Sequence, residues 1–300
     1  MGEGFGNGKI ILFGEHFVVH NLPAIAGAIS NKAIVKLIKS EKTEFFPGDH
    51  KTIPEMTYKC INNIFSAMNI KDKFKIYLKG NLPTFGGLGS SAAFCVAIVR
   101  ALDDEYSLHL TANRIIDYSY QGERAFHGNP SGIDNTISAL GGVLKFTRGK
   151  TPSENKFEKI SLKSPLIVII GITGIFGPTS VMVAKVGDFK KNNPEKFENL
   201  SKKMIQIISN AQISLERREI EKLGRLMDEN QILLKEIGVS IKENDRLIKI
   251  MKNAGALGAK ITGGGGGGCC TALAKDQTEA KKILKEIKIN GFDGFLTIIE

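Results

Sequence analysis

LPTFGGLGSSAAF, residues 82–94, places a glycine-rich loop directly before an apolar run that we expect to be a buried helix starting at Ser90. Such a helix presents the unsatisfied N–H groups of its first turn, and the positive end of its dipole, to a loop with almost no side chains in the way. This arrangement is typical of an anion site, most often one for phosphate. The alternative interpretation is a glycine-rich turn in which Ser90 is an ordinary N-cap residue.

The loop does not match the two commonest nucleotide-binding motifs. No lysine precedes the serines, as a GxxxxGK[ST] loop requires, and no GxGxxG lies between a strand and a helix with an acidic residue about twenty positions later. The positive charge for a bound phosphate must therefore come from elsewhere in the chain. Lys9 begins an apolar strand at residues 9–13 and is a candidate, and Glu15 and His16 follow the same strand. A lone Glu–His pair is more often structural than catalytic.

Polar residues also gather where a predicted helix over residues 112–126 ends in the loop HGNPSGIDN. Glu123, together with the hydroxyl of Ser90 or Ser91, would supply the hard oxygen ligands that Mg²⁺ prefers. Asp134 is then available as a base, or as the group that orients an attacking hydroxyl.

The composition is that of an ordinary folded protein: 42% of the 300 residues are apolar and 24% are charged. The net charge of +10 comes from lysines that alternate with acidic residues, and the aromatic residues (7%, no Trp) are not interleaved with them, so we expect no nucleic acid partner. The longest apolar stretch, residues 166–176, is about half of a membrane span, so no membrane partner is expected either. The first residues lack a signal-peptide pattern and the four cysteines form no CxxC, which favours a cytoplasmic protein without zinc or disulfides.

The order of predicted elements indicates an α+β chain of two halves, with strands and helices mixed up to about residue 146. Long helical patterns come later, at residues 195–210, 212–237 and 244–253. The polar, turn-rich stretch at residues 147–159 is the best candidate for a domain boundary. We therefore predict an N-terminal domain over residues 1–155 and a C-terminal domain over residues 156–300.

Four segments of the chain resemble, in order, the sequence motifs of the mevalonate kinase family in the GHMP kinase superfamily. The segments are GKIILFGEHFVVH (residues 8–20), GGLGSSAA (86–93), HGNPSGIDN (127–135) and KIT followed by six glycines (260–268). Because the four occur together and span nearly the whole chain, the resemblance is specific.

The resemblance implies the two-domain GHMP kinase fold with the active site in the cleft between the halves. It also implies ATP as co-substrate, Mg²⁺ as cofactor, and transfer of the γ-phosphoryl group to the primary hydroxyl of (R)-mevalonate, a step of isoprenoid biosynthesis that yields 5-phosphomevalonate. Carried over by position, Lys9 and Asp134 are the catalytic residues, and Ser91 and Glu123 hold the metal. The nucleotide-binding residues are Gly86, Gly87, Leu88, Gly89, Ser90 and Ser91. The substrate-binding residues are Lys9, Glu15, His16, Ser131, Asp134 and Thr179.

Two departures from the family pattern and several alternatives stay open at this point. Asn21 stands where the family usually has glycine, and the third motif lacks its common alanine, which affects fine geometry rather than any functional group. A related enzyme such as phosphomevalonate kinase or the related decarboxylase, or a non-catalytic ligand sensor of the same fold, would carry similar motifs. The retention of Lys9, Glu123 and Asp134 together argues against a sensor, and the sequence leaves a homodimer open.

Overall fold

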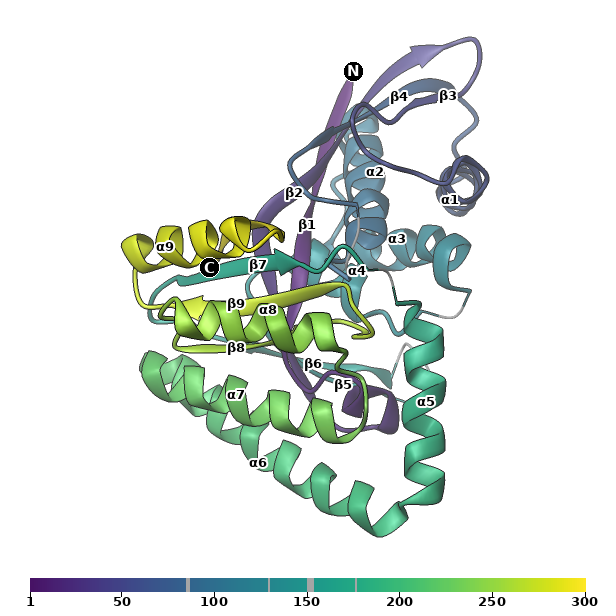
Figure 1. Ribbon diagram of the computed structural model, residues 1–300. Helices are drawn as coiled ribbons and strands as arrows, with labels where there is room; N and C mark the ends of the chain where they lie inside the picture. Colours follow the sequence, from purple (N-terminus) through teal and green to yellow (C-terminus); the bar gives the residue numbers. More distant parts are fainter. Residues whose placement is uncertain (85–86, 129, 150–153, 176) are drawn as a thin grey trace. The chain divides into compact units, whose positions relative to one another are not determined.

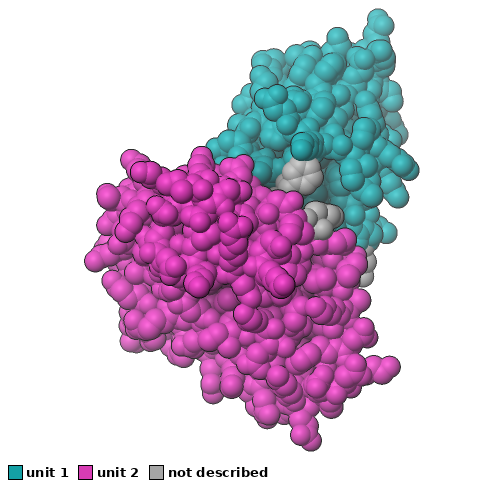
Figure 2. All heavy atoms as spheres, viewed as in Figure 1, with its two compact units in different colours: residues 1–9, 28–141 teal, residues 10–27, 142–300 magenta. Residues whose placement is uncertain are grey.

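The computed structural model describes residues 1–84, 87–128, 130–149, 154–175 and 177–300 (Figure 1). It has the predicted α+β character, since helices and mainly antiparallel strands both occur along the chain. The chain divides into two compact units, which Figure 2 colours separately: unit 1 contains residues 1–9 and 28–141, and unit 2 contains residues 10–27 and 142–300. Within the described ranges, no helix is long and apolar enough to cross a membrane.

Unit 1 combines strands with a group of mutually packed helices. Its elements are β3 (Glu44–Phe46), β4 (Lys73–Gly80), α1 (Pro54–Ala67), α2 (Ser90–Tyr106), α3 (Ala112–His127), α4 (Ile133–Leu140) and parts of β1 (Gly2–Phe13) and β2 (Ala24–Ser40). Strand β4 runs antiparallel to the second half of β2, from Ala33 opposite Gly80 to Ser40 opposite Lys73, and β3 lies parallel to β4. Helices α1, α2 and α4 all contact α3. This helix group carries most of the predicted chemistry.

The glycines at the start of β1 allow this strand to lie directly on α2. A Cβ atom added at Gly2, Gly4 or Gly6 would lie 2.1–2.3 Å from a backbone atom of α2, which is far closer than any real contact. These alternate positions share one side of the strand. Gly2, Gly4 and Gly6 therefore serve the close packing of one backbone on another.

Unit 2 is built around a four-stranded antiparallel sheet in the order β10–β7–β9–β8. Its strands are β5 (Val143–Thr147), β6 (Lys156–Ile160), β7 (Leu166–Ile172), β8 (Gly258–Thr262), β9 (Cys269–Ala274) and β10 (Asp293–Ile299). Its helices are η1 (Phe17–His20), α5 (Thr179–Asn192), α6 (Pro194–Arg217), α7 (Ile220–Glu236), α8 (Lys242–Asn253) and α9 (Gln277–Ile289). Helix α7 packs on β8, α8 contacts β8 and β9, and α9 contacts β7 and β10. The first residues of β2 pair with β5, which in turn pairs with β6.

The compact units differ from the predicted domains at residues 1–155 and 156–300. The division falls at Gly141 and Gly142, and residues 10–27 belong to unit 2 although they lie near the start of the chain. The reason is that β1 and β2 each begin in one unit and continue into the other. The polar stretch at 147–159 contains the last residue of β5, the chain between the two strands and most of β6, which pairs with β5. A connection between paired strands has the same polar, turn-rich composition as a domain linker, so composition alone does not separate the two.

Candidate active site

The glycine-rich loop leads into α2 as predicted, with Ser90 as the first helical residue. The N-cap position is occupied by Gly89 in the left-handed conformation (φ 71°), and no side chain among the described residues caps this helix end. Ser90 is therefore not the N-cap, and the alternative of an ordinary side-chain cap is wrong. Gly87 also has a positive φ, and Leu88 is buried between the two glycines. Gly86 lies outside the described residues.

Lys9 joins the end of β1 in unit 1 to this loop. Its backbone N–H donates to the carbonyl oxygen of Leu88 at 2.8 Å, and its side chain is buried. The Lys9 ammonium lies 3.1 Å from Oδ1 of Asp134, whose side chain is 30% exposed. The structure thus pairs the two predicted catalytic residues, with the lysine in the interior and the carboxylate partly open to a ligand.

Asp134 is held by the start of α4. The N-cap of that helix is Gly132 in a left-handed conformation (φ 84°), and Asp134 occupies the first turn between the buried residues Ile133 and Asn135. The predicted substrate residue Ser131 immediately precedes the cap and is half-buried. The helix start therefore fixes the backbone from which the carboxylate projects.

Glu123 lies in the interior of unit 1 on α3, with 1% of its surface exposed. The hydroxyl of Ser91 donates to its Oε1 at 2.8 Å, so the predicted metal pair is in direct contact. Burial raises the pKa of Glu123 to about 8, and the charge of Asp134 adds to this rise, while hydrogen bonds from Ser91 and Cys95 and the charge of Lys9 oppose it. A nearby cation would stabilise the ionised form of a carboxyl group whose pKa is raised by burial.

Sequence reasoning gave no role to His127, although it lies in the third of the described motif segments. Its Nε2 is 3.4 Å from Oε1 of Glu123 and 3.5 Å from Oγ of Ser91. The signal was available, because positions 123 and 127 are one helical turn apart on α3 and must share a face.

A hollow of about 530 Å³ also belongs to unit 1. It is lined by residues 48–51 and 78–84. The second of these segments leads along the chain into the loop at residues 87–89. In the sequence, only residues 85 and 86 separate the lining of the hollow from the described part of the glycine-rich loop.

In unit 2, Glu15 is fully buried in an ion pair with Lys260, which is also fully buried. Asn230 on α7 donates to the second carboxylate oxygen of Glu15 at 3.4 Å. Burial raises the pKa of Glu15 and lowers that of Lys260, although the opposite charge of each partner counteracts the effect. The carboxylate that was predicted to line the substrate pocket is thus engaged inside the unit, where it braces the turn that carries His16.

His16 is the strained residue of that turn, with a φ of 59° in a region that side chains rarely adopt. Its Nε2 lies 2.8 Å from the carbonyl oxygen of Gly264, and because a carbonyl can only accept, Nε2 must carry the proton. Burial lowers the pKa of His16, which favours the neutral ring. Its Nδ1 is buried without a partner among the described residues and is then a free acceptor.

Thr179, at the start of α5, lies against Gly264 in the segment of six glycines at residues 263–268. A Cβ atom added at Gly264 would be 2.7 Å from the Thr179 hydroxyl oxygen. His16 and Thr179, which are far apart in sequence, therefore meet at Gly264 in unit 2.

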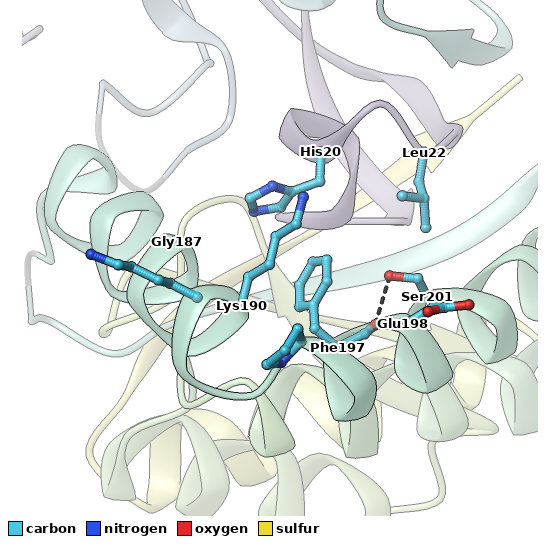
Figure 3. Close-up of a pocket in the computed structure, with 9 residues that line it drawn as sticks. His20, Leu22, Gly187, Lys190, Phe197, Glu198 and Ser201 are labelled. Carbon is cyan, nitrogen blue, oxygen red and sulfur yellow. Dashed lines mark hydrogen bonds between the residues drawn. The ribbon is translucent and has the colours of Figure 1, made fainter.

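Unit 2 also contains a pocket of about 560 Å³ that involves none of the predicted site residues. Figure 3 shows the rings of His20 and Phe197 beside the side chain of Lys190, with the centroids of the two rings 4.9 Å apart. Phe197 stacks on Phe17 as well, so the pocket wall anchors η1, the helix that follows His16.

Comparisons with known proteins identify the class of protein. The model for the N-terminal domain of GHMP kinases matches residues 55–142, and the model for their C-terminal domain matches residues 211–293. The fold is therefore that of a GHMP kinase.

Individual relatives narrow the class. The mevalonate kinase of Pyrococcus furiosus is 33% identical over 97% of this chain and 94% of its own length, and that of Thermococcus gammatolerans is 35% identical over 90% and 88%. The crystal structure of L. major mevalonate kinase in complex with R-mevalonate is 30% identical and covers 100% of this chain and 96% of its own, with a TM-score of 0.93. The chain belongs to the mevalonate kinase family of GHMP kinases, which confirms the resemblance and the fold class predicted from the sequence.

Proposed function

We propose that this enzyme transfers the γ-phosphoryl group of ATP to the primary hydroxyl of (R)-mevalonate and releases 5-phosphomevalonate and ADP. The observation that carries the proposal is the 3.1 Å pair of Lys9 and Asp134, beside a helix start that no described side chain caps. Phosphoryl transfer depends mainly on positioning and electrostatic stabilisation. The ion pair would position the acceptor, and the lysine charge and the helix start would stabilise negative charge.

ATP is the ligand that suits the loop at residues 87–91. The N–H groups and the dipole at the start of α2 attract phosphate oxygens. The absence of a Cβ at Gly89 leaves room for the stem of Lys9, whose Cγ would lie 2.7 Å from an added Cβ. The hollow lined by residues 48–51 and 78–84 is large enough for part of a nucleoside and adjoins this loop along the chain. We assign the phosphates to Gly86, Gly87, Leu88, Gly89, Ser90 and Ser91.

Lys9 and Asp134 activate the acceptor. The mevalonate hydroxyl oxygen forms a bond to the γ-phosphorus as the bond from that phosphorus to the ADP oxygen breaks, and the hydroxyl proton passes to Asp134. Lys9 holds the Asp134 carboxylate in place and its charge stabilises the developing alkoxide. The partial exposure of Asp134 fits a group that must reach its substrate.

The Ser91 and Glu123 side chains fit Mg²⁺. They supply a hydroxyl and a carboxylate 2.8 Å apart, and the raised pKa of Glu123 shows a buried acid that a cation would relieve. Among the described residues no group of three or more His, Cys, Asp or Glu side chains could hold a metal by itself. Mg²⁺ is commonly held by one or two carboxylates, waters and substrate phosphates, so a small protein contribution suffices. Ser91 and Glu123 would hold the ion, which would supply positive charge against the charge of the phosphates.

We assign substrate contacts in unit 2 to His16 and Thr179, with Glu15 as the support of His16, and in unit 1 to Ser131. The Nδ1 of His16, which has no partner within the described part of the chain, is an acceptor suited to a hydroxyl group of mevalonate. The strain at His16 supports this assignment, because strained backbone is concentrated at functional sites.

The test is ADP release, measured by a coupled assay with ATP, Mg²⁺ and one acceptor at a time: mevalonate, 5-phosphomevalonate, galactose or homoserine. We expect turnover with mevalonate alone. Turnover with 5-phosphomevalonate instead would assign the enzyme to the next phosphorylation, and binding of ATP without turnover on any acceptor would indicate a ligand sensor.

A further inference from the structure

Two buried thiols lie behind the Glu123 carboxylate in unit 1. Cys60 on α1 and Cys95 on α2 are both free and have no exposed surface. The Sγ atom of Cys95 lies 3.7 Å from Oε2 of Glu123 and 3.4 Å from the Sγ atom of Cys60. The three residues come from three helices that meet at this point.

Counting protons fixes the direction of these contacts. Burial raises the pKa of Glu123 to about 8, but as a metal ligand this group must be ionised. An ionised carboxylate can only accept, so Cys95 donates its single S–H to Oε2 of Glu123. The sulfur of Cys95 then has no proton left for Cys60, and Cys60 must donate its own S–H to Cys95. The result is a directed chain from Cys60 through Cys95 to Glu123.

The same face of α2 therefore supplies a donor to each oxygen of Glu123. Ser91 and Cys95 are four positions apart, which places their side chains one above the other on a helix. Ser91 donates to Oε1 and Cys95 donates to Oε2. The carboxylate is held at both ends by residues of a single helical turn.

Gly122 lets the Cys95 sulfur lie close to α3. Gly122 precedes Glu123 on α3, and a Cβ atom added there would lie 3.0 Å from the Cys95 sulfur and 2.7 Å from Cδ1 of Ile64. The missing side chain at Gly122 thus makes the room in which the sulfur lies next to the Glu123 carboxylate.

We propose that Cys95 is a positioning residue for the metal ligand Glu123: its S–H holds Oε2 in the interior, so that Oε1 faces Ser91 and the Mg²⁺ position. The inference rests on the proposed function, because it assumes that Glu123 is a ligand. Hydrogen bonds to a ligating carboxylate orient the ligand, and their loss commonly costs about 10- to 100-fold in metal affinity or activity. Because a thiol is a weak donor, we expect the lower end of this range.

The experiment measures the initial rate of ADP release against Mg²⁺ concentration at saturating mevalonate and a fixed concentration of ATP, in the full-length protein. Cys95→Ala should raise the Mg²⁺ concentration for half-maximal rate by about tenfold. Cys95→Ser, which keeps a donor, should recover most of this loss. Cys60→Ala is the matched control, since it removes an equally buried thiol that does not contact Glu123 and leaves Cys95 its own S–H for Oε2. It should leave the Mg²⁺ requirement within about twofold of the wild type, a smaller effect than the loss of the direct donor.

The outcomes separate this inference from the proposed function. Absence of Mg²⁺-dependent turnover in the wild type overturns the proposed function. An increased Mg²⁺ requirement in Glu123→Gln but not in Cys95→Ala supports Glu123 as a ligand and overturns the role of Cys95. Equal effects of Cys95→Ala and Cys60→Ala overturn it as well, because they would show a general packing defect.

A second measurement does not depend on whether Cys95→Ala folds. The infrared S–H stretching band of the wild type should shift when Mg²⁺ and a non-hydrolysable ATP analogue bind, because the charge of Oε2 then changes. This shifting band should be lost in Cys95→Ser, while the other S–H bands remain. An S–H spectrum that is insensitive to Mg²⁺ in the wild type contradicts the proposal.

Discussion

Lys9 combines three constraints in one residue. Its backbone closes on the glycine loop through Leu88, its stem lies under Gly89, and its ammonium contacts Asp134. A buried ammonium is stable only with such a partner, and a carboxylate beside a phosphoryl group is favoured only with a cation nearby. The two residues therefore depend on each other.

This dependence predicts non-additive kinetics. Asp134→Asn and Lys9→Met should each lower kcat by about 10² to 10⁴ with ATP affinity nearly unchanged. The double variant should be little worse than the poorer single variant, because residues that act as a unit are lost together. Turnover, ATP affinity and melting temperature on the three variants test this.

A purely structural ion pair would give a different pattern. Both single variants would then lose thermal stability and bind both substrates poorly. Full activity in Asp134→Asn would eliminate the catalytic role of this carboxylate.

At the level of elements, two glycines have different roles at helix α2. Gly6 in β1 lets the strand pack on the body of α2, whereas Gly89 forms the N-cap and leaves the helix start open. At Gly89 any side chain meets both a left-handed φ and the stem of Lys9, 2.7 Å from an added Cβ.

We therefore expect Gly89→Ala to weaken ATP binding by about tenfold or more, about 1.4 kcal/mol, because a side chain is strained at this left-handed φ and disturbs the helix start. Gly6→Ala is the matched control: an added Cβ there would lie 2.1 Å from the carbonyl oxygen of Ala93, so it should lower the melting temperature without a specific loss of ATP affinity in the folded fraction. Calorimetric titration with an ATP analogue and thermal melts compare the two. Unchanged ATP affinity in a destabilised Gly89→Ala would assign that glycine to packing alone.

The elements that the sequence could predict are those with local signals. The helices at residues 90–106 and 112–127 follow from apolar periodicity and from the glycines and polar residues at their ends. The predicted break between residues 210 and 212 is wrong, because α6 continues to Arg217. The chain turns at Arg218 in a left-handed conformation (φ 63°), where neither glycine nor proline marks the end.

The residues of the candidate site also divide into those with a local sequence signal and those without one. Ser91, Glu123 and Asp134 could be found because each lies in or next to a motif with its own chemistry. The contact of Glu15 with Lys260 joins positions 245 residues apart, and Asn230 comes from a helix with no motif at all. Such contacts follow from how distant elements pack, which no local pattern records.

For the whole molecule, the path of the chain matters more than its composition. It passes from unit 1 to unit 2 within β1, returns within β2, and leaves unit 1 again at Gly141. A single cut therefore cannot separate the units. The core of unit 2 includes Phe13, Phe17 and Ile25 from the early segment, all with no exposed surface.

This path predicts that a fragment of residues 1–155 does not fold as an independent domain. The fragment retains residues 10–27 but loses nearly all of the unit that buries them, and it leaves β5 without its partner β6. Exposure of three such side chains costs about 1.5–3 kcal/mol each, which is a large part of the stability of a domain. The fragment should bind a hydrophobic dye and lack a cooperative thermal transition, whereas the 300-residue chain should melt cooperatively. A second fragment, in which a short glycine–serine linker replaces residues 10–27 and the chain ends at Gly141, matches unit 1 and should regain cooperativity. If the fragment of residues 1–155 melts as cooperatively as this redesigned one, residues 10–27 are not an essential part of the second unit.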